Sequence, residues 1–245
     1  MSDTTDAFEQ MASSFDDDPS PRRHKQSGLM KRVATKITSP PTFWTSGLAK
    51  ALVGDQPCLL SIWLPSHQEI VKVRRDESAL ARWKVAHTEL LTATTKTYRA
   101  AGWKCSVESF FRVTGSAAIL SGKADLIAQK PEERPLIVDV KSGESRDSDV
   151  AQVMIEQIAV PLAWSSPSMI FNGRVVYEDH SVDVTPAEAQ SLKPKLFALL
   201  RKLGSDDRPP ANPSQSACRF CHVGPTDCPE RWVDQSAAEV TTLEF

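Results

Sequence analysis

Three cysteines lie close together near the C-terminus of this 245-residue chain, because Cys218, Cys221 and Cys228 fall within eleven residues. In a reducing compartment such a group indicates a metal or cluster site before disulfides, since thiolates bind zinc and iron-sulfur clusters. A closed site needs a fourth ligand. The candidates for it are Cys58, Cys105 and, for zinc, His222. A ligand at residue 58 would close a very long loop around the rest of the fold, which by analogy with cross-links is worth several kcal/mol.

The composition allows one full-sized domain with an ordinary core, since 40% of the residues are hydrophobic. The net charge is −2, so any contact with nucleic acid must come from local basic patches. No apolar run of about 18 residues exists, and no apolar stretch follows a basic start. We therefore expect a soluble, cytoplasmic protein that does not enter a membrane.

Composition also predicts the domain boundaries. Residues 1–40 are rich in Ser, Asp, Thr and Pro, which is typical of a mostly disordered tail. The basic run at residues 22–25 fits a solvated segment better than a phosphate site. We expect an ordered domain over residues 41–235 and a short C-terminal tail over residues 236–245.

Hydrophobic periodicity, caps and turn residues predict an α/β fold. On the second of the expected helices, Leu80, Trp83, His87 and Leu90 share one face. Pro194 should kink or divide the last helix. The expected helices cover residues 45–53, 77–101, 149–164 and 185–204, the expected strands cover residues 106–114, 117–128 and 135–140, and Asn172-Gly173 should form the turn of a further hairpin.

Charged residues interrupt two of the expected strands. Side chains alternate along a strand, so Asp139 and Lys141 point the same way. A turn centred near Glu132 places Asp125 opposite Asp139, and the same register places Lys123 opposite Lys141. Opposed carboxylates repel each other unless a divalent cation such as Mg²⁺ or Mn²⁺ lies between them. A salt-bridged sheet edge is an equally good interpretation of these residues alone.

Together, these features resemble the PD-(D/E)XK nucleases of the RecB and AddB type, particularly the CRISPR-associated four-cysteine exonucleases. The resemblance covers about Pro41 to Trp232 and includes the order of the elements: cysteine, histidine helix, Asp strand, Asp-x-Lys strand, Gln helix, three cysteines. It implies a restriction-endonuclease-like core, in which helices flank a central mixed sheet. It also implies that an iron-sulfur cluster joins the N- and C-terminal segments.

The resemblance assigns roles to individual residues. It implies catalytic roles for Asp125, Asp139, Lys141 and Gln152, a Mg or Mn ion at His87, Asp125, Asp139 and Val140, and a 4Fe-4S cluster at Cys58, Cys218, Cys221 and Cys228. Without it, His87 would be interpreted as a satisfied core histidine. The family commonly has Tyr four residues after the glutamine, where this chain has Glu156. That carboxylate would ligate a second metal, repel the DNA backbone, or be a solvated helix residue.

The function implied is that of a metal-dependent DNA nuclease, an exonuclease acting on single strands or DNA ends. Its setting would be recombination and repair, CRISPR adaptation or phage DNA processing, with a helicase or an integration complex as a possible protein partner. We expect DNA contacts from Lys72, Arg74, Arg75 and Lys123. Two alternatives remain: a non-catalytic DNA-binding subunit that keeps the nuclease fold, and a zinc-stapled scaffold with no nucleic-acid role.

Overall fold

The computed structural model describes residues 40–73 and 77–232. The chain divides into two units, Met1–Val33 and Ala34–Phe245, and all described residues belong to the second. Apart from Pro40, the predicted tails at 1–40 and 236–245 lie outside the described residues.

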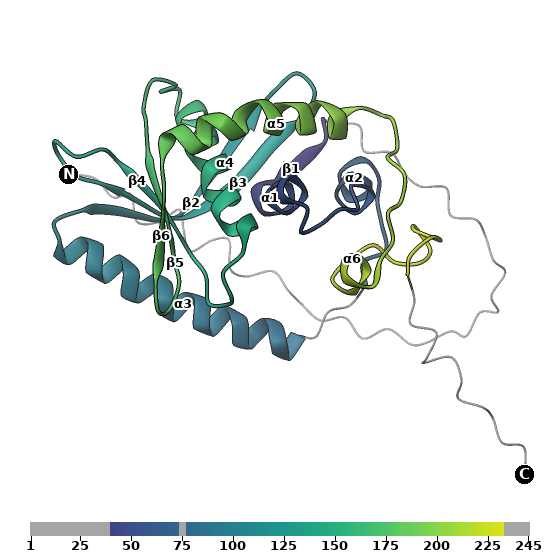
Figure 1. Cartoon of the computed structure of the whole chain (residues 1–245), viewed down its shortest axis with the longest axis horizontal. Coiled ribbons are helices and arrows are strands. Elements are labelled where there is room, and N and C mark those ends of the chain that lie inside the picture. The colour runs from purple at the N-terminus through teal and green to yellow at the C-terminus, as the bar shows by residue number, and fades with distance from the viewer. Residues whose placement is uncertain (1–39, 74–76, 233–245) are drawn as a thin grey trace, which may run out of the picture. The chain divides into compact units, whose positions relative to one another are not determined.

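A six-stranded mixed sheet forms the centre of the described residues (Figure 1). The strands run in the order β1-β3-β4-β5-β6, and β2 pairs with the other edge of β3. The β1–β3 and β4–β5 pairs are parallel, and the remaining pairs are antiparallel. The strands are β1 (Thr42–Trp44), β2 (Lys104–Thr114), β3 (Ile119–Gln129), β4 (Leu136–Val140), β5 (Asn172–Val176) and β6 (Ser181–Val184).

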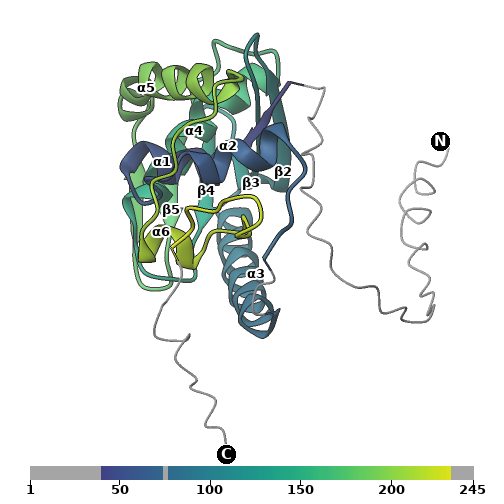
Figure 2. The ribbon, with the colours of Figure 1, turned by 90° about the vertical axis from the view of Figure 1, so that its right-hand side faces the viewer.

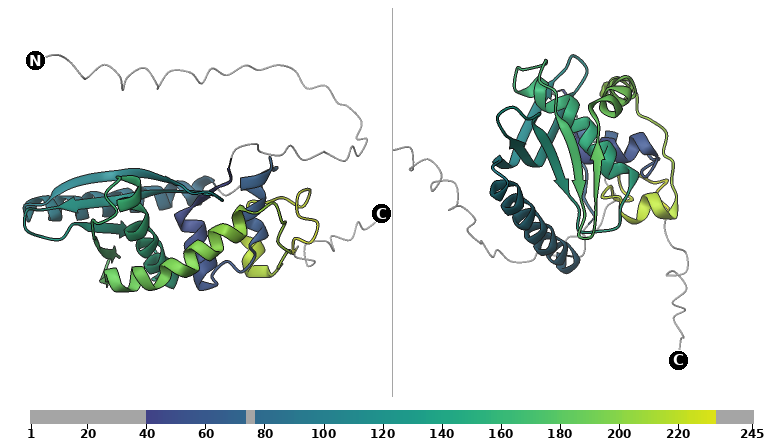
Figure 3. Two further views of the ribbon diagram at one scale, coloured as in Figure 1. Left: turned by 90° about the horizontal axis from the view of Figure 1, so that it is seen from above. Right: turned by 60° about the vertical axis from the view of Figure 1, so that its left-hand side comes forward.

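Helices cover both faces of the sheet (Figure 3). The helix α3 (Glu77–Ala100) lies on one face, where Leu91 packs against Leu126, Val138 and Val140. On the other face α1 (Thr45–Val53), α4 (Asp147–Ala163) and α5 (Pro186–Gly204) enclose the larger core. The fold is therefore α/β with a mixed sheet flanked by helices.

Most of the expected elements are confirmed, including the register of the central hairpin. Leu126 pairs with Val138 and Ile127 with Ile137, which is the register of a turn centred on Glu132. Glu132 itself has a left-handed backbone conformation, with φ 64°, as turns often require. The α4 helix begins two residues earlier than predicted. Its N-cap is Arg146, whose main-chain N–H donates a hydrogen bond to the side chain of Asp149.

The predicted turn at Asn172-Gly173 is wrong. These residues begin β5, and the hairpin turn falls between β5 and β6. A Cβ atom at position 173 would lie 2.5 Å from Val153 Cγ1 on α4. The glycine therefore serves the close approach of strand and helix, a tertiary requirement that the Asn-Gly turn preference does not contain.

Two short helices lie near the C-terminal cysteines. The apolar stretch after Cys58 forms α2 (Leu60–His67), and α6 (Gln215–Arg219) carries Cys218 (Figure 2). Pro194 does not divide α5, which continues through it after a capping box of Thr185 and Glu188. No helix within the described ranges is long and apolar enough to cross a membrane.

Candidate functional site

The candidate site lies where one edge of β3 changes partner. β1 pairs with Ile119–Ser121 and β4 pairs with Leu126–Ala128, so residues 122–125 lie between the two neighbouring strands. Asp125 occupies the end of this opening, and its Oδ2 accepts a hydrogen bond from the main-chain N–H of Val140 at 2.9 Å. The carboxylate therefore lies between β3 and β4 and is fixed by both strands.

On the α3 side of this opening, His87 faces Asp125. The distance from His87 Nε2 to Asp125 Oδ1 is 3.6 Å. The polar contact with this carboxylate raises the pKa of His87 above its usual value, although partial burial acts in the opposite direction. Leu91, one turn further along α3, is buried against the sheet and so holds the histidine at this position.

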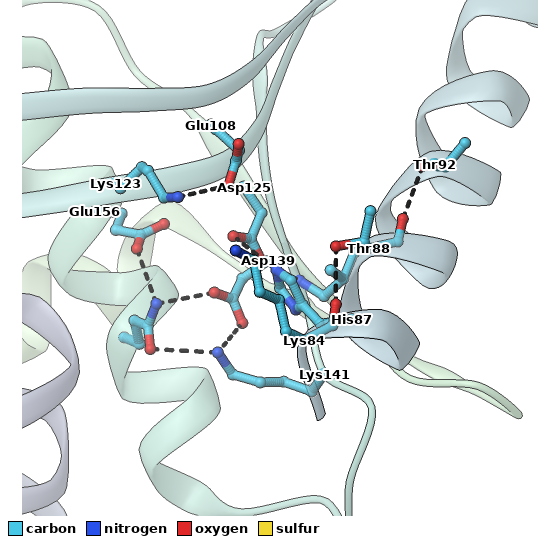
Figure 4. Close-up of polar contacts among 12 residues, drawn as sticks. Lys84, His87, Thr88, Thr92, Glu108, Lys123, Asp125, Asp139, Lys141 and Glu156 are labelled. Carbon is cyan, nitrogen blue, oxygen red and sulfur yellow. Dashed lines mark hydrogen bonds and ion pairs between the residues drawn. The ribbon is translucent and has the colours of Figure 1, made fainter. Parts of the chain in front are cut away.

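Asp139, Lys141 and Gln152 form a connected polar network beside Asp125 (Figure 4). Lys141 Nζ lies 2.6 Å from Asp139 Oδ2 and donates to Gln152 Oε1 at 3.3 Å. Gln152 Nε2 donates to Asp139 Oδ1 at 2.9 Å. Asp139 is only 1% exposed, and this burial, opposed by the charge of Lys141, raises its pKa to about 7. The strand β4 and the helix α4 thus bring together three of the residues implied by the resemblance.

Glu156 extends this network one turn along α4. Its Oε1 accepts a hydrogen bond from Gln152 Nε2 at 3.2 Å, and the side chain has no exposed surface. Burial and the charge of Asp139 raise the pKa of Glu156 well above its usual range. The interpretation of Glu156 as a solvated helix residue is therefore wrong. Because its side chain is fully buried, it also has no direct access to an approaching phosphate backbone.

Other residues assigned from the sequence lie apart from this network. The expected pairing of Lys123 with Lys141 does not form, since the β3–β4 ladder ends at Leu126 and Lys123 forms an ion pair with Glu108. Lys72 is exposed and bridges to Val223 near the cysteines. Arg74 and Arg75 lie outside the described residues. Val140 can offer an ion only its main-chain carbonyl, since its side chain is apolar.

Two neighbours of the site were not assigned to it from the sequence. Glu108 lies on β2 beside Asp125, since its neighbours Val107 and Ser109 pair with Leu126 and Ala124. Its backbone has a left-handed conformation, with φ 50°. No local signal for this conformation exists, because it arises where the two strands pass Asp125. Trp83, which the sequence places on the same helix face as His87, stacks on it with ring centroids 5.2 Å apart.

The donor set fits a divalent cation. Three carboxyl groups, an imidazole and a lysine belong to one cluster of polar contacts, and oxygen donors suit Mg²⁺ or Mn²⁺. Within residues 40–73 and 77–232, no three His, Cys, Asp or Glu side chains form a ready-made metal cage. Both oxygens of Asp139 already contact Lys141 and Gln152, so a cation would bind there by replacing one of these contacts.

The stability of the metal-free protein is expected to fall as the pH rises from about 4 to about 7. With a pKa of about 7 in the folded state and about 4 in the unfolded chain, Asp139 binds more protons when folded, and this favours the folded state at low pH. His87, whose pKa is also raised, contributes in the same direction. Urea titrations in EDTA at pH 5 and pH 8 should differ by on the order of 2 kcal/mol.

Asp139→Asn should flatten this pH dependence, whereas Asp183→Asn, at an exposed ion pair with Arg174, should leave it unchanged. Mg²⁺ or Mn²⁺ should stabilise the wild-type protein more at pH 8 than at pH 5, because a cation binds the ionised carboxylate. A pH dependence that is identical in the wild type and in Asp139→Asn would show that Asp139 does not titrate in this range.

The four cysteines assigned to the cluster line one pocket. Cys58 comes directly before α2, Cys218 lies on α6, and Cys221 and Cys228 follow in the next loop. Burial raises the pKa of Cys228, and the charges of Glu230 and of the other three cysteines add to this effect. Cys105 is absent from the pocket and packs with the α3-side core. His222, the alternative zinc ligand, does not line the pocket either.

The surroundings of the cysteines suit thiolate ligands. Main-chain N–H groups of Asn212 and Trp232 point at the sulfurs of Cys58 and Cys218, at 3.5 and 3.4 Å. The Arg231 guanidinium donates to the main-chain carbonyls of residues 218, 221 and 223. Because N–H groups stabilise negative sulfur, these contacts fit thiolate ligands at Cys58 and Cys218. The raised pKa of Cys228 means that its thiol would lose its proton when a metal or cluster binds.

The sequence matches no protein-family model and no curated protein. Among solved structures, one described as "Crystal structure of SSO0001" is similar at 14% sequence identity and a TM-score of 0.40, covering 76% of this chain and 84% of that chain. A similarity at this level supports no assignment of function.

Proposed function

We propose that the protein is a metal-dependent DNA nuclease that hydrolyses phosphodiester bonds, acting as an exonuclease on single strands or DNA ends. The observation that supports this most is the network of Asp139, Lys141 and Gln152 beside Asp125, at the opening between β1 and β4. If these residues formed only a salt-bridged sheet edge, one buried carboxylate would be enough to pair with the one lysine. The cluster holds more buried carboxylates than that. Burying ionisable groups is costly, so such an excess indicates a site with a chemical role.

A Mg²⁺ or Mn²⁺ ion held by Asp125 and Asp139, with His87 and the Val140 carbonyl nearby, would polarise the phosphate and lower the pKa of a bound water. Lys141 is positioned to orient the attacking water and to stabilise charge that develops on the phosphate oxygens. Gln152 contacts both Lys141 and Asp139, so it fixes the positions of both. We further propose that Cys58, Cys218, Cys221 and Cys228 hold a structural 4Fe-4S cluster.

One observation favours a second candidate, a non-catalytic DNA-binding subunit. Both oxygens of Asp139 are engaged by Lys141 and Gln152, and such a closed network could serve stability alone. The two candidates make opposite predictions for catalysis. We favour the nuclease because Lys141, partly exposed, can leave Asp139 when a cation arrives.

The proposal is tested with single- and double-stranded DNA labelled at the 5′ or the 3′ end. The protein is purified anaerobically and incubated with Mg²⁺, Mn²⁺ or EDTA. We expect cleavage with either metal ion and none in EDTA. Asp125→Asn should abolish it, whereas the matched surface variant Asp183→Asn should cleave at the wild-type rate. Binding of DNA without cleavage under every metal condition would identify the non-catalytic subunit instead.

A further inference from the structure

Two exposed aromatic rings meet on the sheet near the candidate site. Trp44 is 54% exposed and Phe110 is 58% exposed. Their ring centroids lie 6.1 Å apart, at an interplanar angle of 62°. Trp44 ends β1 and Phe110 lies on β2, and these strands pair with opposite edges of β3. The two rings can touch only if both stand over the same face of β3, and together we call them the aromatic platform.

The aromatic platform is continuous with the candidate site. Phe110 lies directly opposite Lys123, and opposed residues of an antiparallel pair share a face. Lys123 is two residues from Asp125 on the same strand, roughly 7 Å along it. In Figure 4, Asp125 lies between the Lys123–Glu108 pair and His87. The aromatic platform thus lies over β3 on the N-terminal side of Asp125.

Positive charge accompanies the aromatic platform. Arg112 lies opposite Ser121, and Trp44 is the other partner of Ser121. Arg112 and Lys123 are both exposed, and they lie on the strands beneath the two rings. Lys123 also pairs with Glu108, so a phosphate would compete with that carboxylate for its ammonium group. Aromatic rings interspersed with cations form the pattern that binds single-stranded nucleic acid, because bases stack on the rings while the cations contact phosphates.

We propose that the aromatic platform of Trp44 and Phe110 is a subsite that stacks an unpaired base of the DNA strand, a short distance from the phosphate that is cut. The inference rests on the proposed nuclease function and adds two specificity-determining residues to it. A base inside a duplex is stacked on both faces and is not available to the aromatic platform. The strand must therefore be unpaired at this position, even where the rest of the substrate is double-stranded.

Binding is measured first, in the Lys141→Ala background so that the DNA stays intact. A single-stranded oligonucleotide carries 5-iodouracil at one position, and this position is varied along the strand. Irradiation should cross-link Trp44 or Phe110 at one or two adjacent positions, identified by mass spectrometry of the peptides. Cross-links distributed over all positions, or absent from both residues, would overturn the subsite.

Kinetics provide the second measurement, with Trp44→Leu and Phe110→Leu in the otherwise wild-type protein. Loss of one stacked base should raise KM for single-stranded DNA about 5- to 100-fold, with kcat changed by less than about twofold. A di- or trinucleotide too short to reach the aromatic platform should be cut equally well by both variants and the wild type. The matched control is Trp164→Leu, since this partly exposed tryptophan ends α4 on the other face of the sheet.

The outcomes separate this inference from the proposed function. Normal cleavage with an unchanged KM in both variants would overturn the subsite and leave the nuclease standing. A wild-type protein that cuts no DNA would overturn the nuclease, and the cross-linking result would then decide the subsite alone. If Trp44→Leu changed the oligomeric state without changing KM, the aromatic platform would be a contact with a second copy. If Trp44→Leu failed to fold, Phe110→Leu would carry the test, because its side chain is more exposed than that of Trp44.

Discussion

Lys141→Ala is expected to lower the rate of DNA cleavage by about 10²- to 10³-fold or more, while the protein still binds DNA. Burial acts to lower the pKa of Lys141, but the combined attraction of Asp139, Asp125 and Asp149 raises it above its usual value, so the amine is charged at neutral pH. Its Nζ is the cation that lies closest to Asp139, at 2.6 Å. Removing it takes away the group that we propose orients water and stabilises charge during the reaction, without removing a core side chain.

The same variant also has a thermodynamic signature. Without Lys141, the buried Asp139 carboxylate loses its partner, and such a loss costs about 3–5 kcal/mol when the group stays ionised. The metal-free variant should therefore melt at a lower temperature than the wild type at pH 8, and a divalent cation should restore much of the difference. Lys130→Ala is the matched control, since Lys130 pairs with Glu133 on the surface. Cleavage at the wild-type rate by Lys141→Ala would refute the proposed mechanism.

The central hairpin of the site can be predicted from the sequence because its determinants are local. The turn at residues 131–134 fixes the register, and strand alternation then directs Asp139 and Lys141 to the same side. These relations involve a short stretch of chain, so the strand period of 2.0 residues is enough to predict them. Gln152 was expected from the resemblance alone, and α4 brings it to the same strand.

The features that sequence reasoning missed depend on contacts between distant segments. Lys123 turns to Glu108 because β3 changes partner from β1 to β4 just before Asp125. Gly173 serves contact with α4, and Glu156 is buried by the packing of α4 on the sheet. The meeting of Trp44 with Phe110 requires two strands on opposite edges of β3, a topology that no local pattern encodes.

Cys58→Ala is expected to remove the cluster and to destabilise the fold. Anaerobically purified wild-type protein should be brown and contain about four irons per chain, and the variant should be colourless. Cys58 is the one pocket cysteine that comes from outside the C-terminal segment. Losing it opens a covalent loop of roughly 160 residues, for which the loop-entropy estimate is about 4–5 kcal/mol. The thermal midpoint should therefore drop by several degrees.

Cys105→Ala is the matched control for this effect, because Cys105 lies on β2 and outside the pocket. It should keep the colour, the iron content and the thermal midpoint. If the four cysteines bind zinc, the anaerobic preparation should contain stoichiometric zinc and no iron. This result would refute the iron-sulfur cluster. An essential Cys105 with a dispensable Cys58 would refute the choice of ligands.

Loss of the cluster should also loosen the N-terminal end of α3. The reason is that α2 and the segment at 71–73 lie between Cys58 and α3 along the chain, and this segment bridges to Val223. The rate of cleavage should then fall in Cys58→Ala, because His87 lies on α3 and loses its fixed position. Lys141→Ala, in contrast, should lower the rate of cleavage and leave the iron content unchanged.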